Sequence, residues 1–363
     1  MKIIYDNIIY SLQRYGGISI VWSNLLQRIL QHDDCDIHIL EYEGAEQHNI
    51  SRKTLELPSK IVHKLGSCMI RLNRYLNPSV PYTKAGIGDE PFIFHSSYYR
   101  TCSHKRAVNV TTVHDFTYEY FVRNPLVRFF HCNQKHRAIR HSDHIVCISE
   151  NTRADLLRLL PDICPEKVSV IYNGVDQRFH RENSVECQHY ALFVGNRDGY
   201  KNFIPLLKPL SECAVSLKIA GKSLTRREIR ALDACGISYE YCGMVTDTEL
   251  NSLYNHALCL IYPSSYEGFG LPVIEAQMAG CPVIAYNASS IPEIIGDKRL
   301  LLDTLDTESL RARITMLYDP LTRESIIKAG IKNAQRFTWE NMEEAYYKLY
   351  RMLLGEHHTL TTK

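Results

Sequence analysis

The sequence predicts an α/β protein with two doubly wound parallel sheets, one per domain, and a final helix. Three observations support this. Strand-like and helix-like segments alternate along the whole chain, which is the pattern of parallel sheets covered by helices on both faces. The length of 363 residues suits two domains better than one. A polar stretch without apolar periodicity, residues 176–188, divides the alternation into two series.

The first series, residues 1–175, predicts the N-terminal domain. It opens with a strand at Ile3–Tyr5, a glycine pair at Gly16 and Gly17, and an amphipathic helix from Ile18 to Leu30. We expect further strands at residues 37–40, 91–95, 108–113, 144–148 and 168–171. Ser149 suits the N-cap of a helix over residues 152–160.

The second series follows the 176–188 linker and predicts a second domain over residues 189–338. We expect its strands at residues 190–194, 215–220, 239–242, 258–262 and 283–286. The last segment, residues 339–363, places Met342, Ala345, Tyr346, Leu349 and Leu353 on one face of a long helix. Such a face needs an apolar surface to cover, and we expect the helix to return to the first domain.

Composition and charge exclude several classes of protein. A hydrophobic fraction of 45% and a charged fraction of 23% predict packed cores rather than disorder. The net charge of +2 lacks the basic excess of a dedicated duplex-DNA binder, so we expect no nucleic-acid partner. The 12 cysteines are scattered without a CxxC pair, which favours reduced thiols in the cytoplasm. We find neither a signal-peptide pattern nor a membrane-spanning window.

One stretch of the first domain is compatible with a membrane surface. Residues 1–172 carry 21 lysines and arginines against 17 aspartates and glutamates. Within them, residues 59–78 interleave Lys60, Lys64, Arg71 and Arg74 with apolar side chains. This basic amphipathic pattern could lie on an anionic membrane. A helix packed on the sheet of its own domain explains the pattern equally well.

Two loops of the first domain hold candidate binding residues, because ligands of open parallel sheets bind beyond the carboxyl ends of the strands. Gly16 and Gly17 would let backbone N–H groups approach a phosphate or a sugar closely, although a purely structural turn is the alternative. His114 and Asp115 follow the strand at 108–113. An imidazole beside a carboxylate can bind a sugar or move a proton; a core or capping histidine is the alternative.

A pair of cations follows the first strand of the second domain. Arg197 and Lys201 are four residues apart. If the loop leads into a helix, both point into one crevice and suit a diphosphate, with the arginine as a bidentate fork and the lysine as a point charge. A solvated pair with Asp198 as its partner is the alternative.

The segment from Tyr262 to Ala276 is the most unusual of the chain. A strand leads into a turn made of Glu267, Gly268, Phe269, Gly270 and Leu271. Pro272 suits the first turn of the helix that follows. Free N–H groups at that helix start can bind an anion or sugar hydroxyls, and Glu275 can accept hydrogen bonds from a diol. A purely structural role could explain either glutamate alone, but it explains the whole segment from Tyr262 to Ala276 poorly.

These motifs together resemble a known family. They are the two glutamates separated by seven residues around Gly-Phe-Gly-Leu-Pro, the Arg197 and Lys201 pair, the Gly16-Gly17 pair, the linker strand from Ile171 to Asp176, and the loop from Ser289 to Glu293. The combination is similar to the retaining glycosyltransferases of family four, the group one transferases. The resemblance covers essentially the whole chain and implies the GT-B fold, in which two Rossmann-like domains face each other across a cleft.

The resemblance also implies a role for each candidate residue. Glu275 would bind the ribose of a nucleotide sugar, and Glu267 would hold the transferred sugar. Arg197 and Lys201 would neutralise the leaving diphosphate, aided by the backbone around Gly268, Phe269, Gly270 and Leu271. Met244 and Val245 would line the base pocket. From the first domain, His114 with Gly16, Gly17 and Asp115 would face the sugar and the acceptor. The expected catalytic residues are therefore His114, Glu267, Arg197 and Lys201.

The same resemblance implies retaining hexosyl transfer without a metal or another cofactor. An Asp34-Cys35-Asp36 string matches the metal motif of the other transferase fold, but it precedes a strand, at the end opposite the ligand crevice. The pattern looks most like bacterial mannosyltransferases of O-antigen or capsule assembly. We therefore expect GDP-mannose as the donor, before UDP-sugars or dTDP-rhamnose, and a glycan acceptor on a lipid at the inner face of the cell membrane. The alternatives are an epimerase, a hydrolase or a non-catalytic binding protein of the same fold.

Overall fold

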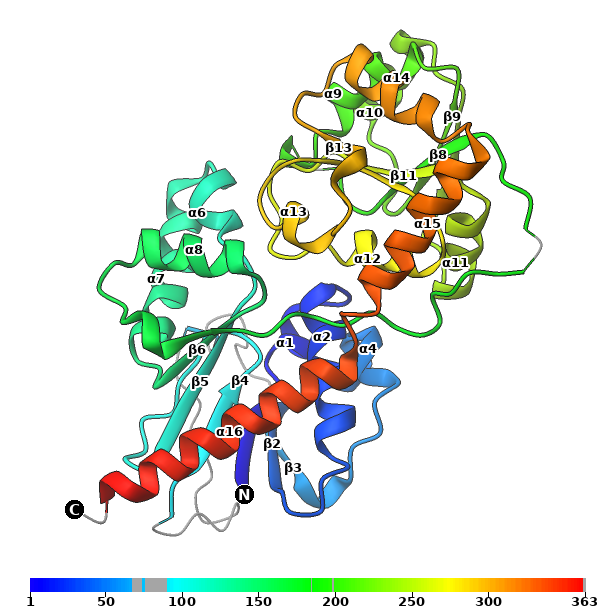
Figure 1. Cartoon of the computed structure of the whole chain (residues 1–363). Coiled ribbons are helices and arrows are strands. Elements are labelled where there is room, and N and C mark those ends of the chain that lie inside the picture. Colours follow the sequence, from blue (N-terminus) through cyan, green and yellow to red (C-terminus); the bar gives the residue numbers. More distant parts are fainter. Residues whose placement is uncertain (67–73, 76–89, 184, 198, 362–363) are drawn as a thin grey trace. The chain divides into compact units, whose positions relative to one another are not determined.

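The chain divides into two compact units in a computed structural model that describes residues 1–66, 74–75, 90–183, 185–197 and 199–361 (Figure 1). The first unit comprises Met1–Gly174 together with the C-terminal segment from Trp339. The second unit comprises Val175–Thr338. The segment 176–188, expected as a linker, therefore belongs to the second unit.

The described part of the first unit contains a seven-stranded parallel sheet of order β3-β2-β1-β4-β5-β6-β7. Its strands are β1 (Lys2–Asp6), β2 (Asp36–Tyr42), β3 (Val62–Leu65), β4 (Phe92–Ser96), β5 (Ala107–Val113), β6 (His144–Cys147) and β7 (Val168–Val170). Its helices are α1 (Ile9–Leu12), α2 (Gly17–Ile29), α3 (Ala45–His48), α4 (Ile50–Lys53), α6 (Thr117–Phe121), α7 (Pro125–Arg140), α8 (Glu150–Leu159) and α16 (Trp339–Thr361), with short 3-10 turns at Ser59–Ile61 and Pro165–Lys167.

Every strand expected in this unit is present, and the Ser149 side chain caps α8 as expected. We expected none of the helices α3, α4, α6 and α7, and two further elements were missed. The four-residue helix α1 stands between β1 and the glycine pair. The edge strand β3, residues Val62–Leu65, pairs with β2 where the sequence suggested a basic amphipathic stretch. The rest of that stretch lies largely outside the described residues. Both elements are only four residues long, too short to show a period in the sequence.

The second unit contains a six-stranded parallel sheet in its described part, of order β10-β9-β8-β11-β12-β13. Its strands are β8 (Tyr190–Val194), β9 (Ser216–Ala220), β10 (Tyr239–Gly243), β11 (Cys259–Tyr262), β12 (Val283–Tyr286) and β13 (Leu301–Leu302). Its helices are α9 (Phe203–Ser211), α10 (Arg226–Cys235), α11 (Asp247–His256), α12 (Leu271–Met278), α13 (Ile291–Ile294), α14 (Thr307–Met316) and α15 (Pro320–Ala334), with 3-10 turns at Gly199–Lys201 and Lys298–Leu300. The two-residue β13 was not foreseen.

The strand order reverses once in each sheet. In the first unit the reversal lies between β1 and β4, and in the second unit between β8 and β11. At such a point the loops leaving two neighbouring strands turn to opposite faces of the sheet and leave a crevice beyond the carboxyl ends. The architecture therefore selects two places for ligand-binding loops, one in each unit.

The C-terminal helix α16 packs on the first unit, as expected. Tyr346 and Tyr350 are buried on its inner face, and Figure 1 shows α16 running across this unit's sheet. The His95 imidazole on β4 hydrogen-bonds the Tyr350 hydroxyl at 2.7 Å and Thr112 Oγ1 at 2.9 Å, and Thr112 also hydrogen-bonds the Tyr346 hydroxyl. Burial lowers the pKa of His95 to about 3, so these are bonds of a neutral ring. No helix in the described ranges is long and apolar enough to cross a bilayer.

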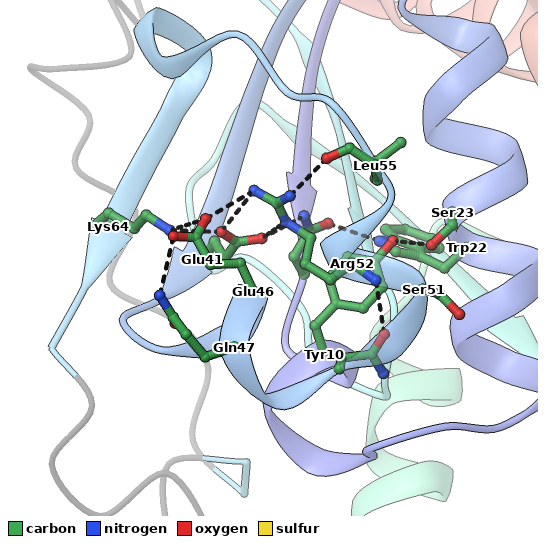
Figure 2. Close-up of polar contacts among 12 residues, drawn as sticks. Tyr10, Trp22, Ser23, Glu41, Glu46, Gln47, Ser51, Arg52, Leu55 and Lys64 are labelled. Atoms are coloured by element: carbon green, nitrogen blue, oxygen red, sulfur yellow. Dashed lines mark hydrogen bonds and ion pairs between the residues drawn. The ribbon is translucent and has the colours of Figure 1, made fainter.

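A buried ionic cluster braces the carboxyl edge of β2 (Figure 2). Glu41 is fully buried, and it accepts from Arg52 Nε at 2.6 Å and from Lys64 Nζ at 2.8 Å. The Arg52 side chain also donates to the Leu55 carbonyl. These cations hold the pKa of Glu41 below its usual value, against the effect of its burial. The cluster ties β2, β3 and α4 together through charges that are satisfied inside the protein.

We expect Arg52→Met to lower the free energy of unfolding by about 3–5 kcal/mol, because it leaves the Glu41 carboxylate buried with an incomplete set of partners. Urea denaturation measures the change. The matched control is Arg28→Met, which breaks an ion pair to the 62% exposed Glu340 and should cost less than about 1 kcal/mol. Equal losses in the two variants would contradict the role given to the buried cluster.

Candidate functional site

The structure brings together two expected site residues at the strand reversal of the second unit. Lys201 lies in the 3-10 turn that follows β8, and Glu267 lies in the turn that follows β11. The Lys201 ammonium forms an ion pair with Glu267 Oε1, and both side chains are largely buried. A cation and a carboxylate, each on a loop leaving one of the two divergent strands, therefore meet in the crevice that the topology creates.

Three contacts that the sequence did not reveal hold these two loops together. Asn202 Nδ2 donates to the Pro263 carbonyl at 2.9 Å. The Ser265 backbone N–H and hydroxyl both donate to the Tyr200 carbonyl, at 2.8 and 2.9 Å. These bonds link the backbone on both sides of the crevice, so the loops that carry Lys201 and Glu267 are held together without a ligand.

Tyr262, the last residue of β11, is a further contact of Glu267. Burial, and then the nearby Glu267 carboxylate, raise the pKa of the Tyr262 hydroxyl well above its usual value. The hydroxyl therefore keeps its proton beside this carboxylate. Glu267 is thus paired with Lys201, and its charge also acts on the Tyr262 hydroxyl.

The Ser289-Ser290 pair holds the backbone of the glutamate turn. The Ser289 hydroxyl donates to the Glu267 carbonyl at 2.6 Å, and the Ser290 hydroxyl donates to the Phe269 carbonyl at 2.8 Å. Gly270 has φ +113°, and a Cβ there would lie 3.0 Å from Ile291 Cδ1. Helix α12 begins at the next residue. The glycine and the serine loop together present the amino end of α12 at the carboxyl edge of the sheet.

Glu275 lies one turn into α12, and its environment changes its acidity. The Tyr254 hydroxyl donates to Glu275 Oε2 at 3.3 Å. Burial raises the pKa of Glu275 to about 7, and the carboxylates of Asp247 and Asp176 add to the rise. Near neutral pH this carboxyl therefore exists in both protonation states. Hydrogen bonds donated by a diol would favour the ionised form.

Arg197 and Lys201 have different partners within the protein. The two residues do not share a helix, because residues 199–201 form a 3-10 turn and Asn202 follows with φ +52°. Arg197 Nε donates to Glu228 Oε1 at 2.9 Å, and Arg197 Nη2 donates to the Ser223 carbonyl at 3.0 Å. The Arg197 guanidinium is thus held against the start of α10, whereas Lys201 faces Glu267.

The expected base-contacting loop lies at the adjoining edge of the same sheet. A glycine of positive φ directly follows β8 and β9, at Gly195 and Gly221, and β10 ends in one, Gly243. The Gly221 N–H donates to the Gly243 carbonyl at 2.8 Å. A Cβ on Gly221 would lie 2.7 Å from the Gly195 carbonyl oxygen, so no other residue fits there. Met244 directly follows Gly243 and its side chain is exposed, whereas Val245 is half-buried. This edge of the sheet therefore offers backbone groups and the Met244 thioether to a planar ligand.

In the first unit, His114 and Asp115 follow β5, as expected. The His114 side chain is buried. Its burial lowers the pKa of His114 to about 4, and the Lys135 ammonium contributes to the fall. Asp115 Oδ1 accepts from the Thr117 N–H at 2.9 Å, at the first residue of α6. A neutral imidazole suits a hydrogen bond to a hydroxyl better than an ion pair with a phosphate.

The glycine pair of the first unit is supported by the buried ionic cluster. Asn49, whose side chain caps α4, donates from Nδ2 to the Gln13 carbonyl at 2.7 Å. The Ile50 N–H donates to the Arg14 carbonyl at 2.9 Å. Gly16 then caps α2, and Gly17 is its exposed first residue. The loop before the glycine pair is therefore held by α4, the helix whose Arg52 pairs with Glu41.

The carboxylates of the Asp34-Cys35-Asp36 string serve local contacts. Asp34 accepts from the Tyr347 hydroxyl at 2.8 Å, and Asp36 pairs with Lys2. Asp36 is the first residue of β2, at the edge opposite the ligand crevice, as expected. The described residues contain no group of three or more histidines, cysteines, aspartates or glutamates arranged to hold a metal ion.

Comparisons with known proteins identify the family. Residues 175–333 match the family model described as glycosyl transferases group 1, and residues 15–179 match the model described as glycosyltransferase family 4. The chain belongs to the group 1, family 4 glycosyltransferases. The two models meet at the boundary between the two structural units, so each unit corresponds to one family module.

Individual relatives of this glycosyltransferase agree with the family. It is 28% identical to the O-antigen chain mannosyltransferase B of Escherichia coli over 72% of this chain and 74% of that one. It is 25% identical to the serotype-specific mannosyltransferase WbdA of the same species, over 61% of this chain but only 30% of that longer protein. The sucrose-phosphate synthase of Thermosynechococcus elongatus has the same GT-B fold, with TM-score 0.77 and 18% identity over 98% of this chain and 100% of that one.

The raised pKa of Glu275 predicts a pH-dependent stability difference from a Glu275→Gln variant. The folded carboxyl titrates near 7 and the unfolded one near its ordinary 4.5. Between these values the folded protein binds more protons, so its stability relative to the variant falls as the pH rises from about 4.5 to about 7. Melting temperatures of both proteins, measured without nucleotide, should show that the variant becomes more stable relative to wild type between pH 5 and pH 8.

The control is Glu308→Gln, which removes an exposed carboxylate from the start of α14. A constant difference between wild type and Glu275→Gln across this pH range would contradict the environment described for Glu275.

Proposed function

We propose that this glycosyltransferase moves a hexose, with mannose from GDP-mannose as the first choice, to a glycan acceptor of surface polysaccharide synthesis. The observation that carries the donor site is the Lys201–Glu267 ion pair at the strand reversal, with Glu275 on the helix that follows. The choice of mannose rests on curated relatives named as O-antigen or serotype-specific mannosyltransferases. A lipid-linked acceptor and a location at the inner face of the cell membrane belong to the same proposal.

The reaction requires stabilisation of a leaving diphosphate. Breaking the bond between the anomeric carbon and the phosphate oxygen leaves negative charge on the phosphate and positive charge on the sugar. A fixed ammonium lowers the barrier electrostatically because no group must reorganise during the reaction. We assign this role to Lys201, whose loop is already held by Asn202 and Ser265. Backbone N–H groups from Gly268 to Leu271 would assist.

Glu267 has two successive partners in this proposal. Without a ligand it neutralises Lys201. When the diphosphate takes over the ammonium, the Glu267 carboxylate becomes available to accept hydrogen bonds from the sugar hydroxyls. Glu275 would accept from the ribose hydroxyls, and Met244 and Val245 would contact the base.

Arg197 is proposed as a second cation for the diphosphate, and its contacts set a condition for this role. Its guanidinium must exchange at least one protein acceptor, Glu228 or the Ser223 carbonyl, for a phosphate oxygen. Lys201 has to exchange only Glu267, and its loop is held by Asn202 and Ser265. We therefore place Lys201 first in importance and Arg197 second.

Retention of configuration is expected from the family, and a front-face reaction accounts for it without a protein nucleophile. The acceptor hydroxyl attacks the anomeric carbon on the side that the diphosphate leaves, and a leaving phosphate oxygen takes the hydroxyl proton. His114, neutral at pH 7, would hydrogen-bond a hydroxyl of the transferred sugar. Gly16, Gly17 and Asp115 complete the proposed sugar and acceptor side.

Thermal denaturation with nucleoside diphosphates tests the donor assignment. A ligand that binds only the folded state at about 100 times its Kd adds about 2.7 kcal/mol of stability, which corresponds to a rise of several degrees. We expect GDP to raise the melting temperature more than UDP or dTDP. A rise with UDP alone would replace GDP-mannose by a UDP-sugar, and no rise with any of the three would contradict the donor site.

Incubation with GDP-mannose separates transfer from the two rival reactions of the same fold. Transfer predicts a mannosylated product that depends on an added lipid-linked glycan. Free mannose released at the same rate without acceptor would identify a hydrolase, and an epimerised donor would identify an epimerase.

A further inference from the structure

Five large apolar side chains are exposed on consecutive turns of the first unit. They are Phe121, Leu126, Val127, Phe129 and Phe130, which we call the 121–130 surface. Their exposed fractions run from 38% at Phe121 to 69% at Leu126, and every residue from Arg123 to Phe130 is exposed. Single exposed apolar side chains are ordinary, but a contiguous group of this size marks an interaction site.

The 121–130 surface is preformed. The Asn124 side chain caps α7 by accepting from the N–H groups of Leu126 and Val127, both at 3.1 Å, and Pro125 occupies the first helical turn. The rings of Phe129 and Phe130 contact each other edge to face. Burial inside the unit begins at His131 and continues through Ala138 and Ile139, and the ring of Phe130 also lies 6.1 Å from that of Tyr75. The exposed half is already an ordered, capped helix end, so binding a partner there requires no loss of conformational entropy to form the helix.

The charge of this helix is one-sided. The sequence has no aspartate or glutamate between Phe121 and Arg140. Within α7, Lys135 is neutralised by Glu119, and Arg140 by Asp162. Arg123, Arg128 and Arg137 have no carboxylate partner among the residues that the structure describes. The apolar side chains are therefore accompanied by uncompensated positive charge.

We propose that the 121–130 surface binds an anionic phospholipid membrane, with the aromatic side chains inserted at the headgroup level and the arginines at the lipid phosphates. Exposed apolar and cationic side chains on one helix are what such binding requires. A second copy of this chain fits less well, because a twofold contact would set the same arginines against each other. The benefit of this contact for reaching a lipid-linked acceptor rests on the proposed function, but the binding itself does not.

This assignment moves the membrane contact away from residues 59–78. In the described part of that stretch, Val62–Leu65 is a sheet-edge strand, and Lys64 already neutralises Glu41. Lys60 remains exposed. The acid-free helix α7 carries both the apolar area and the unpaired cations.

A Phe129→Trp variant reports the contact directly. The two natural tryptophans, Trp22 and Trp339, are buried, so a change in emission reports residue 129. We expect a blue shift with vesicles of phosphatidylcholine and phosphatidylglycerol, and a much smaller one with phosphatidylcholine alone or at high salt. Inorganic phosphate should not reproduce the shift. The absence of a shift with the anionic vesicles would overturn the proposal.

Co-sedimentation with the same vesicles, without donor or acceptor, separates the two parts of the surface. Phe129→Ala with Phe130→Ala should weaken binding roughly tenfold or more through lost apolar burial. Arg123→Ala with Arg128→Ala should weaken it roughly tenfold or more through lost attraction to anionic lipid. The matched controls are Leu321→Ala, at an 83% exposed position of the second unit, and the exposed Lys332→Ala, which should bind as wild type does.

Two outcomes would overturn the membrane assignment. One is unchanged vesicle binding in both double variants. The other is wild-type dimerisation in solution that the phenylalanine variants abolish, which would assign the surface to a second copy. Because no nucleotide is present, these results stand apart from the donor tests: vesicle binding without nucleotide binding would refute the proposed function and leave this inference intact.

Discussion

The reversal of strand order between β8 and β11 is the constraint on which the proposed donor site depends. It directs the loops after these strands to opposite faces of the sheet, and the crevice between them must be lined by whatever those loops carry. Here they carry a lysine and a glutamate, which neutralise each other. A buried cation without a partner would be costly. Glu267 therefore makes it possible to keep Lys201 in place without a ligand.

The same pairing of buried charges recurs across the molecule. Glu41 is buried with Arg52 and Lys64, and Arg197 is held by Glu228. The buried ions thus have partners within their own unit, and the residual basic character appears at the surface, on α7. The chain is close to neutral as a whole, so it is the local placement of charge that distinguishes its surfaces. Net charge alone could not have located either the ion pair or the basic helix.

Much of the fold could be predicted from the sequence, because alternating strands and helices leave few arrangements for a parallel sheet. The loops that hold Lys201, Glu267 and Glu275 could also be located, since glycines and charged residues directly follow buried strands. The contacts of Tyr254, Ser289 and Asn202 could not, because they join residues distant in sequence and follow no spacing rule. Arg197 shows the limit most clearly: a four-residue spacing predicts a shared direction only within a helix, whereas residues 199–201 form a 3-10 turn and α9 begins only at Phe203.

The central claim, that Lys201 binds the diphosphate of the donor, is tested most directly by calorimetry with the preferred nucleoside diphosphate and with its nucleoside. We expect Lys201→Met to weaken binding of the nucleoside diphosphate roughly 10–100-fold, because one charge-assisted hydrogen bond is lost. Binding of the nucleoside should be unchanged. Lys332→Met, at an exposed position of α15, should match wild type for both ligands. Wild-type affinity of Lys201→Met for the diphosphate would contradict the account.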